Sequence, residues 1–155
     1  MKAGRTIEAM LQELARQSAA KEDYLVNTSC LVMETDGSVP TLRMAGREEV
    51  QLSPLGIRPT AHQQIGTYLG IPTKYYGKML AEDTELLAYN VNRWFQRNPE
   101  QRMLRTIDGH ARAFLSNRYR RIENLDIARF TLPRLAELDG ARVESCEVTE
   151  DRMYI

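Results

Sequence analysis

Apolar residues recur at helical spacing in five stretches of the chain. The first stretch predicts a helix over about residues 6–20, with Thr6 as its N-terminal cap and one apolar stripe along its length. That stripe consists of Ile7, Met10, Leu11, Leu14 and Ala15. Further helices are predicted over about 60–69, 73–80, 84–97 and 124–138. In the helix over 84–97, the apolar face comprises Leu87, Val91, Trp94 and Phe95.

Two pairs of strand-like stretches are each divided by an Asp-Gly dipeptide, the strongest short-range signal for a β-hairpin. Asp36-Gly37 divides CLVMET from SVPTLRM, and Asp108-Gly109 divides RMLRTI from HARAFLS. Residues 46–59 read as a loop, and strands are predicted in ARVESCEV and at EDRMYI. These elements predict an α+β fold in which a small, mostly antiparallel sheet has helices packed on one face.

The length of 155 residues fits a single domain spanning 1–155. The pattern stops at Ile155 inside a predicted strand, so we expect this chain to be truncated at its C-terminus and the natural protein to continue beyond it. The N-terminus lacks the apolar core of a signal peptide, and no stretch approaches the ~20 apolar residues of a membrane span. We therefore expect a cytoplasmic protein that makes no membrane contact.

Metal and cofactor chemistry find no support in the sequence. Cys30 and Cys146 form no CxxC motif, and with His62 and His110 they give no metal-ligand spacing. Phosphate-binding glycine loops and the common hydrolase motifs are also missing. We expect no cofactor and no metal, and an enzyme is disfavoured unless a C-terminal continuation supplies the chemistry, with His110 as one possible base.

Charge is segregated along the chain although the whole is neutral. From Arg93 to Arg129 there are nine arginines and four acidic residues, a net charge of +5, while residues 130–155 carry −3. Aromatic residues are interleaved with these arginines. Arginines hold phosphates and aromatic rings stack on bases, so this composition suits single-stranded nucleic acid better than duplex. A solvated charged face is the alternative.

The second hairpin makes this hypothesis specific. A two-residue turn at Asp108-Gly109 places Arg105 opposite Arg112 and Met103 opposite Phe114, on the face away from the core. Like charges directly opposite are unfavourable, so something must compensate. Either a carboxylate such as Glu144 or Glu147 does so, or an external phosphate does, with Phe114 beside it as a stacking platform.

The loop after this hairpin holds the densest basic cluster, namely Arg118, Tyr119, Arg120 and Arg121. Its residues either bind an anion near the following helix N-terminus or anchor the loop. With the hairpin residues, the predicted nucleic-acid-binding set is Arg105, Arg112, Phe114, Arg118, Tyr119, Arg120 and Arg121.

A second region, AHQQIGTYLGIPTKYYGKML, resembles a helix-turn-helix. Gly66 allows close helix packing, and Gly70 stands at the turn. Lys74 and Lys78 could touch phosphates, but such helix pairs are also frequent as plain packing units. Pro72 and the Tyr-Tyr pair are not typical of a recognition helix.

Several blocks of the sequence are similar to one known family over roughly residues 50–155. These blocks are LGIP with Tyr75-Tyr76, Asn92-Arg93-Trp94, LSNRYR with Asn124, and VTEDRMYI. They resemble the phage/plasmid-like proteins of the domain-of-unknown-function 932 family, whose members are often longer than this chain. The resemblance implies a mobile-element setting and assigns no catalytic residue.

The sequence thus predicts a non-enzymatic nucleic-acid-binding protein of a phage or plasmid, in a context of single-strand binding or recombination. Two alternatives stay open. One is a protein-interaction module that contacts a host factor or itself as a homo-oligomer, and its mark would be an exposed apolar patch. The other is the enzyme completed by a C-terminal continuation.

Overall fold

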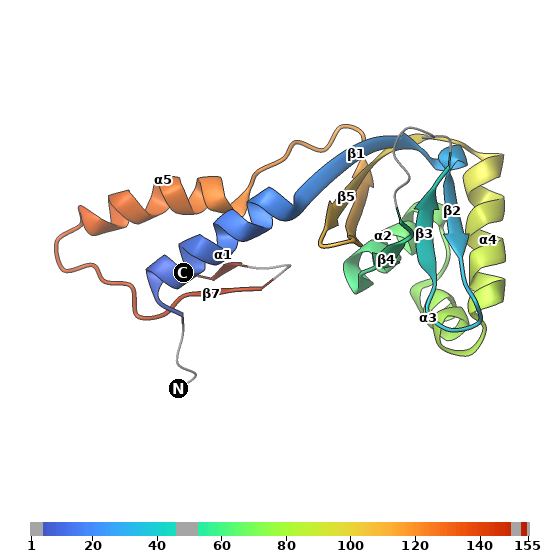
Figure 1. The fold of residues 1–155 in the computed structure, drawn as a ribbon, viewed down its shortest axis with the longest axis horizontal. Helices are drawn as coiled ribbons and strands as arrows, with labels where there is room; N and C mark the ends of the chain where they lie inside the picture. Colours follow the sequence, from blue (N-terminus) through green and yellow to red (C-terminus); the bar gives the residue numbers. More distant parts are fainter. Residues whose placement is uncertain (1–4, 46–52, 150–152, 155) are drawn as a thin grey trace. The chain divides into compact units, whose positions relative to one another are not determined.

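The computed structural model describes residues 5–45, 53–149 and 153–154 (Figure 1). The chain divides into two compact units, unit 1 comprising Met1–Lys21 and Arg120–Ile155, and unit 2 comprising Glu22–Tyr119. Each unit has a hydrophobic cluster of its own. The hydrophobic pattern does not indicate this division, because unit 1 is assembled from the two ends of the chain.

Unit 2 is built on a six-stranded sheet of order β1-β5-β6-β4-β3-β2. Its pairing is mostly antiparallel, with β4 and β6 as one parallel pair. The predicted α+β class is confirmed, although the sheet is larger than expected. Its strands are β1 (Lys21–Asn27), β2 (Leu31–Glu34), β3 (Thr41–Met44), β4 (Leu55–Ile57), β5 (Gln101–Ile107) and β6 (His110–Ser116).

Two of these strands were not expected from the sequence. β1 begins with the charged residues Lys21, Glu22 and Asp23, which hide the apolar alternation on which a strand prediction depends. β4 has only three residues and lies between Pro54 and Pro59, in a stretch predicted as loop. Both strands exist because the rest of the sheet offers them an edge to pair with, and that information is not local.

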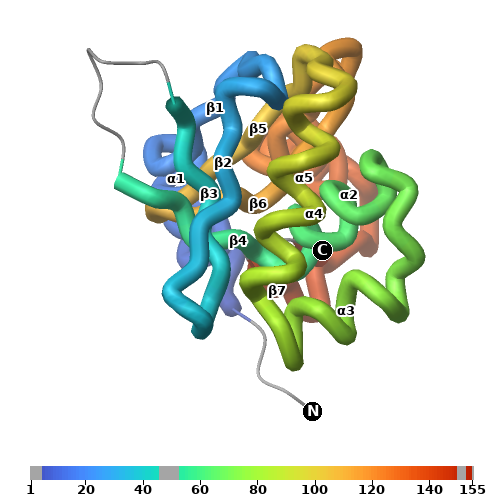
Figure 2. Tube along the Cα trace, turned by 90° about the vertical axis from the view of Figure 1, so that its right-hand side faces the viewer, coloured from blue at the N-terminus to red at the C-terminus, as the bar shows by residue number. Residues whose placement is uncertain are grey.

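Two helices pack on this sheet and a third packs on these two, and all three were predicted: α2 (Pro59–Leu69), α3 (Thr73–Glu82) and α4 (Thr84–Arg97). α2 packs on β6, α4 packs on β2, and α3 contacts both helices (Figure 2). Asp83 caps α4 by accepting a 2.9 Å hydrogen bond from the backbone N–H of Leu86. Leu87, Val91 and Phe95 bury the inner face of α4 in the core.

Both predicted hairpins are present. β2 pairs antiparallel with β3, and β5 pairs antiparallel with β6. In the second hairpin, Asp108 and Gly109 have φ values of +48° and +74°. Positive φ at both central positions is the signature of a type I′ turn, whose twist matches that of the strands and which favours this dipeptide.

Unit 1 consists of α1 (Ile7–Ala20), α5 (Asn124–Ala136) and a short ribbon of β7 (Glu147–Val148) and β8 (Met153–Tyr154). Both helices agree with prediction, and the Thr6 hydroxyl caps α1 by accepting from the backbone N–H of Ala9 at 3.2 Å. The strand expected over 141–148 is limited to Glu147–Val148. In the described part of the chain, no helix is both long and apolar enough to span a bilayer.

Candidate nucleic-acid interface

Arg105 is a buried residue of β5 and not the exposed cation that the sequence predicts. Its side chain is only 6% exposed. Its Nε donates to Oδ1 of Asp23 on β1 at 2.9 Å, so a carboxylate from an unexpected strand balances its charge. The predicted pairing with Arg112 is wrong as well, because Arg105 pairs with Ala113 across the hairpin.

A β-bulge causes this change of register. Thr106 faces Ala111 and Arg105 faces Ala113, so Arg112 is the extra residue of the bulge. The side chain of Arg112 is half-buried there. The Arg-Arg conflict that led to the hypothesis of an external anion is therefore absent from the hairpin.

The same bulge moves Phe114 into the core. One inserted residue sends every later side chain to the opposite face of the strand, so Phe114 faces Leu104 and not Met103. Phe114 is 1% exposed, and its ring centre lies 5.8 Å from that of Phe95. The prediction that Phe114 stacks on bases is wrong, because the ring is surrounded by the helices that cover the sheet.

The turn that follows β6 keeps two of the predicted residues at the surface. The backbone N–H of Tyr119 donates to the carbonyl of Ser116 at 3.1 Å, which closes the turn. Arg118 is exposed, and Tyr119 is 40% exposed with its ring 5.9 Å from the guanidinium carbon of Arg105. Within the described chain, no carboxylate lies within 4.0 Å of the Arg118 guanidinium.

Arg120 and Arg121 are both exposed. The boundary between the two units falls between Tyr119 and Arg120, so these two arginines belong to unit 1. They form no part of the surface of unit 2 described next.

The outer face of α4 carries exposed residues that lie outside the set predicted from the sequence. Tyr89, Arg93 and Arg97 follow one another at four-residue spacing, which places them on one side of a helix. Trp94 was predicted on the apolar face of this helix but is 39% exposed, and the guanidinium of Arg97 lies over its ring at 5.4 Å. Regular spacing opposite the predicted apolar face was the signal that could have identified this surface.

The C-terminal end of α4 and the 116–119 turn both adjoin the first residues of β5. α4 ends at Arg97, β5 begins at Gln101, and Arg102 near the start of β5 pairs with Ser116 at the end of β6. We call this region the basic end, defined as Arg93, Trp94, Arg97, Arg102, Arg118 and Tyr119. With Glu100, the acidic residue of these segments, its net charge is +3.

Arg102 is held inside the basic end by aromatic rings. Its guanidinium lies 4.5 Å from the ring centre of Tyr68 and 5.1 Å from that of Phe114. Its side chain is 17% exposed and 3.9 Å from the carboxylate of Glu100. Arg102 therefore adds charge beneath the surface, while Arg93, Arg97 and Arg118 present guanidinium groups to solvent.

In the helix pair α2–α3, both glycines occupy the positions expected from the sequence. Gly70 ends α2 with φ +68°. A Cβ on Gly66 would lie 2.9 Å from Cδ2 of Tyr76, so any larger residue would have to displace the buried ring of Tyr76. Lys74 and Lys78 are exposed on α3, and Lys78 is 3.9 Å from the carboxylate of Glu82. Two lysines, one of them next to an acid, are a sparse contact set for a recognition helix.

A buried polar pair joins these two helices. His62 is 7% exposed, and its Nδ1 lies 2.9 Å from the hydroxyl of Tyr76. Burial lowers the pKa of His62 to about 4 and raises the pKa of Tyr76 well above its usual range. The histidine is therefore neutral at physiological pH, and the pair acts as a packing contact of the core.

His110, the possible base of the enzyme alternative, lies at the start of β6. It is exposed, and its Nδ1 is 2.8 Å from the carbonyl oxygen of Asp108 in the turn. Its ring also rests on Gly56, where a Cβ would lie 2.5 Å from Cδ2 of the imidazole. Among the described residues, no cluster of three or more His, Cys, Asp or Glu side chains could hold a metal ion.

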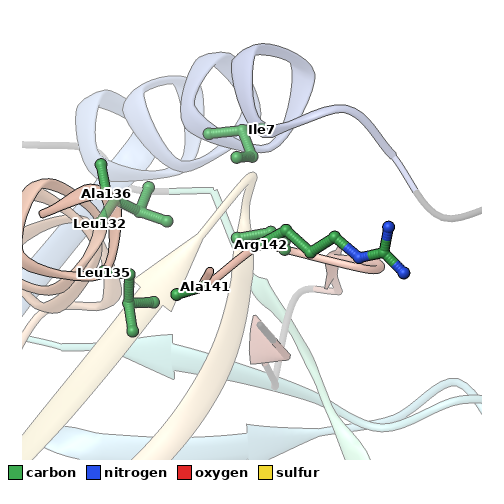
Figure 3. Close-up of a pocket in the computed structure, with 7 residues that line it drawn as sticks. Ile7, Leu132, Leu135, Ala136, Ala141 and Arg142 are labelled. Carbon is green, nitrogen blue, oxygen red and sulfur yellow. The ribbon is translucent and has the colours of Figure 1, made fainter. Parts of the chain in front are cut away.

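Unit 1 contains an apolar cavity of about 220 Å³ (Figure 3). Its walls are Ile7, Leu132, Leu135, Ala136, Ala141, Arg142 and Val143. The guanidinium of Arg142 points away from the apolar side chains, and its Nε donates to Glu144 at 2.5 Å. No charged group among these wall residues is directed into the cavity.

Comparison with protein-family models, with curated proteins and with solved structures yields no match for this chain. The resemblance to the domain-of-unknown-function 932 family therefore stays a prediction.

Proposed function

We propose that the protein binds single-stranded nucleic acid, without catalysis, through the basic end of unit 2. The observation that carries the proposal is that Arg93, Arg97 and Arg118 are exposed and, within the described chain, have no carboxylate within 4.0 Å. An arginine that no acid neutralises is available to a phosphate, and its planar fork can bind two phosphate oxygens at once.

Exposed aromatic rings beside these cations favour single strands over duplex. Trp94 and Tyr119 are 39% and 40% exposed. Unpaired bases present their faces to such rings, whereas the bases of a duplex are stacked on one another. The α2–α3 pair supports duplex recognition less well, because its exposed lysines are few.

The proposal keeps the function expected from the sequence but changes the residues that perform it. Arg105 and Phe114 now act as supports: Arg105 lies against Tyr119, and Phe114 lies against Arg102. Arg118 and Tyr119 remain in the contact surface, while Arg93, Trp94 and Arg97 join it. The family resemblance adds the setting of a phage or plasmid but no mechanism.

Trp94 is the one tryptophan of the chain, so its fluorescence reports directly on the proposed site. Titration with a short oligothymidine should quench this fluorescence at low salt and less so as salt rises. Three phosphate contacts on a single strand give a slope of log affinity against log salt of about −2. Failure to bind at low salt, or binding that is insensitive to salt, would show that the proposal is wrong.

A matched pair of variants separates this site from general charge. Arg97→Ala should weaken binding, whereas Arg43→Ala should not. Arg43 is also a partly exposed arginine of unit 2, with 41% of its side chain accessible, but Glu34 holds it at 2.6 Å. Equal loss in both variants would indicate a diffuse charge effect and not a site.

A further inference from the structure

α5 has two opposite apolar faces, of which one is buried. Leu125, Ala128 and Leu132 point into the cluster that α5 shares with α1. On the other side, Phe130 is 61% exposed and Ile127 is 39% exposed. In a helix that turns by about 100° per residue, Phe130 lies opposite the midpoint of the buried stripe. Figure 1 shows α5 alongside α1, the helix that it contacts in unit 1.

The exposed face of α5 is symmetric about Phe130. Ile127 and Pro133 stand three residues before and after it, and both are exposed. Asp126 and Arg134 stand four residues before and after it, and both are exposed as well. All five side chains lie within about 60° of the direction of Phe130 on a helical projection.

We propose that two copies of this chain associate through antiparallel packing of this α5 face, with a two-fold axis at Phe130. In such a pair, a residue a given number of positions before Phe130 meets the residue the same number of positions after Phe130 in the other copy. Phe130 meets Phe130, Ile127 meets Pro133, and Asp126 meets Arg134 in two reciprocal ion pairs. The same arrangement buries the apolar side chains at the centre and pairs the opposite charges at the rim.

The charges of Asp126 and Arg134 favour a second copy of this chain as the partner of the exposed α5 face. Asp126 and Arg134 cannot satisfy each other within one helix, because eight residues span about 12 Å along the axis. Within the described chain neither has an ion pair. The Arg134 guanidinium instead lies 3.5 Å from the ring centre of Phe130, where it covers the apolar patch in the single copy.

The helix ends place two reciprocal like-charge pairs near this interface. Glu123 and Glu137 stand seven residues before and after Phe130. Glu123 is already neutralised by Lys21, whose Nζ lies 2.9 Å from its carboxylate. Helices that pack at an angle also separate toward their ends, so these two pairs oppose the association only weakly.

Charge reversal tests the pairing directly. Asp126→Arg and Arg134→Asp should each weaken self-association by about tenfold or more, because both reciprocal ion pairs become repulsive. An equimolar mixture of the two variants should associate again, because in the mixed pair each arginine at 126 or 134 meets an aspartate. Sedimentation velocity of the full chain, up to about 1 mM, measures all three cases.

A wild-type chain that stays monomeric over the whole range overturns the proposal. An association that survives both reversals places the interface on another surface. Loss in the single variants without recovery in the mixture overturns the antiparallel pairing, provided that circular dichroism shows folded variants.

A second measurement does not depend on charge. A residue on a two-fold axis meets its own copy, so Phe130→Cys should form a disulfide-linked dimer under mild oxidation. Arg129→Cys, one position away on an exposed flank, should link much more slowly, and wild type gives the background from Cys30 and Cys146. Equal rates at positions 129 and 130 would overturn the proposal.

Discussion

The guanidinium of Arg105 and the carboxylate of Asp23 form a buried ion pair between β5 and β1, with Nε and Oδ1 2.9 Å apart. The two residues are 82 positions apart in sequence. This ion pair links the edge strand β1 to β5. It also gives the buried Arg105 a counter-charge that comes from outside its own hairpin. Arg105 thereby serves the stability of unit 2, while its neighbour Tyr119 remains at the surface.

Replacement of Asp23 should therefore lower the stability of the folded protein. Asp23→Ala leaves the Arg105 charge buried without its carboxylate, and the free energy of unfolding should fall by about 3 kcal/mol. Urea denaturation followed by circular dichroism measures this loss. The matched control is Glu34→Ala, which breaks the partly exposed pair with Arg43 and should cost at most about 1 kcal/mol. Similar losses in both variants would contradict a buried role for Arg105.

Two aromatic residues on either side of the surface should respond in opposite ways. Phe114→Ala removes a fully buried ring and should lower the free energy of unfolding by about 3–5 kcal/mol. Tyr119→Ala removes a partly exposed ring and should leave stability nearly unchanged, but should weaken oligothymidine binding by about 1–3 kcal/mol. Thermal unfolding and fluorescence titration of the same samples separate the two effects. A stable Phe114→Ala variant would argue against the bulged register.

Arg118 should contribute mainly to the electrostatic part of nucleic-acid binding. Arg118→Ala should reduce the slope of log affinity against log salt by about 0.7, the value for one lost phosphate contact on a single strand. Fluorescence anisotropy at several salt concentrations measures the slope. Arg43→Ala should leave it unchanged, and a slope that is identical in Arg118→Ala and wild type would remove Arg118 from the surface.

Stability should depend on pH through His62. Burial lowers its pKa in the folded state to about 4 from a usual value of 6.5. Between these two values the unfolded chain binds a proton that the folded chain does not, so stability falls as pH decreases from about 6.5 toward 4. The expected loss is about 2–3 kcal/mol.

Chemical denaturation across this pH range tests the assignment. His62→Gln should flatten the pH dependence between pH 6.5 and 4, whatever its effect on stability at neutral pH. His110→Gln, which changes an exposed histidine, should preserve the dependence. If the His62→Gln variant keeps the full pH dependence, other groups are responsible.

Local patterns in the sequence determined most elements of this fold. Five helices and two hairpins follow from apolar spacing, from caps such as Thr6 and from Asp-Gly turns, because each depends on residues close together in the chain. The α+β class followed from these elements. The same local reasoning located the basic segment and the exposed pair Arg118 and Tyr119.

Tertiary structure alone decided which face each side chain of the second hairpin occupies. The extra residue Arg112 in the bulge places Phe114 in the core and not on the predicted surface. The residues near Arg112 in the sequence carry no pattern that predicts such a bulge. The sheet also recruited β1 and β4 by offering hydrogen-bonding edges, and β1 brought Asp23 to Arg105. Composition and periodicity describe a strand's own residues, whereas register, partner and counter-charge depend on segments distant in sequence.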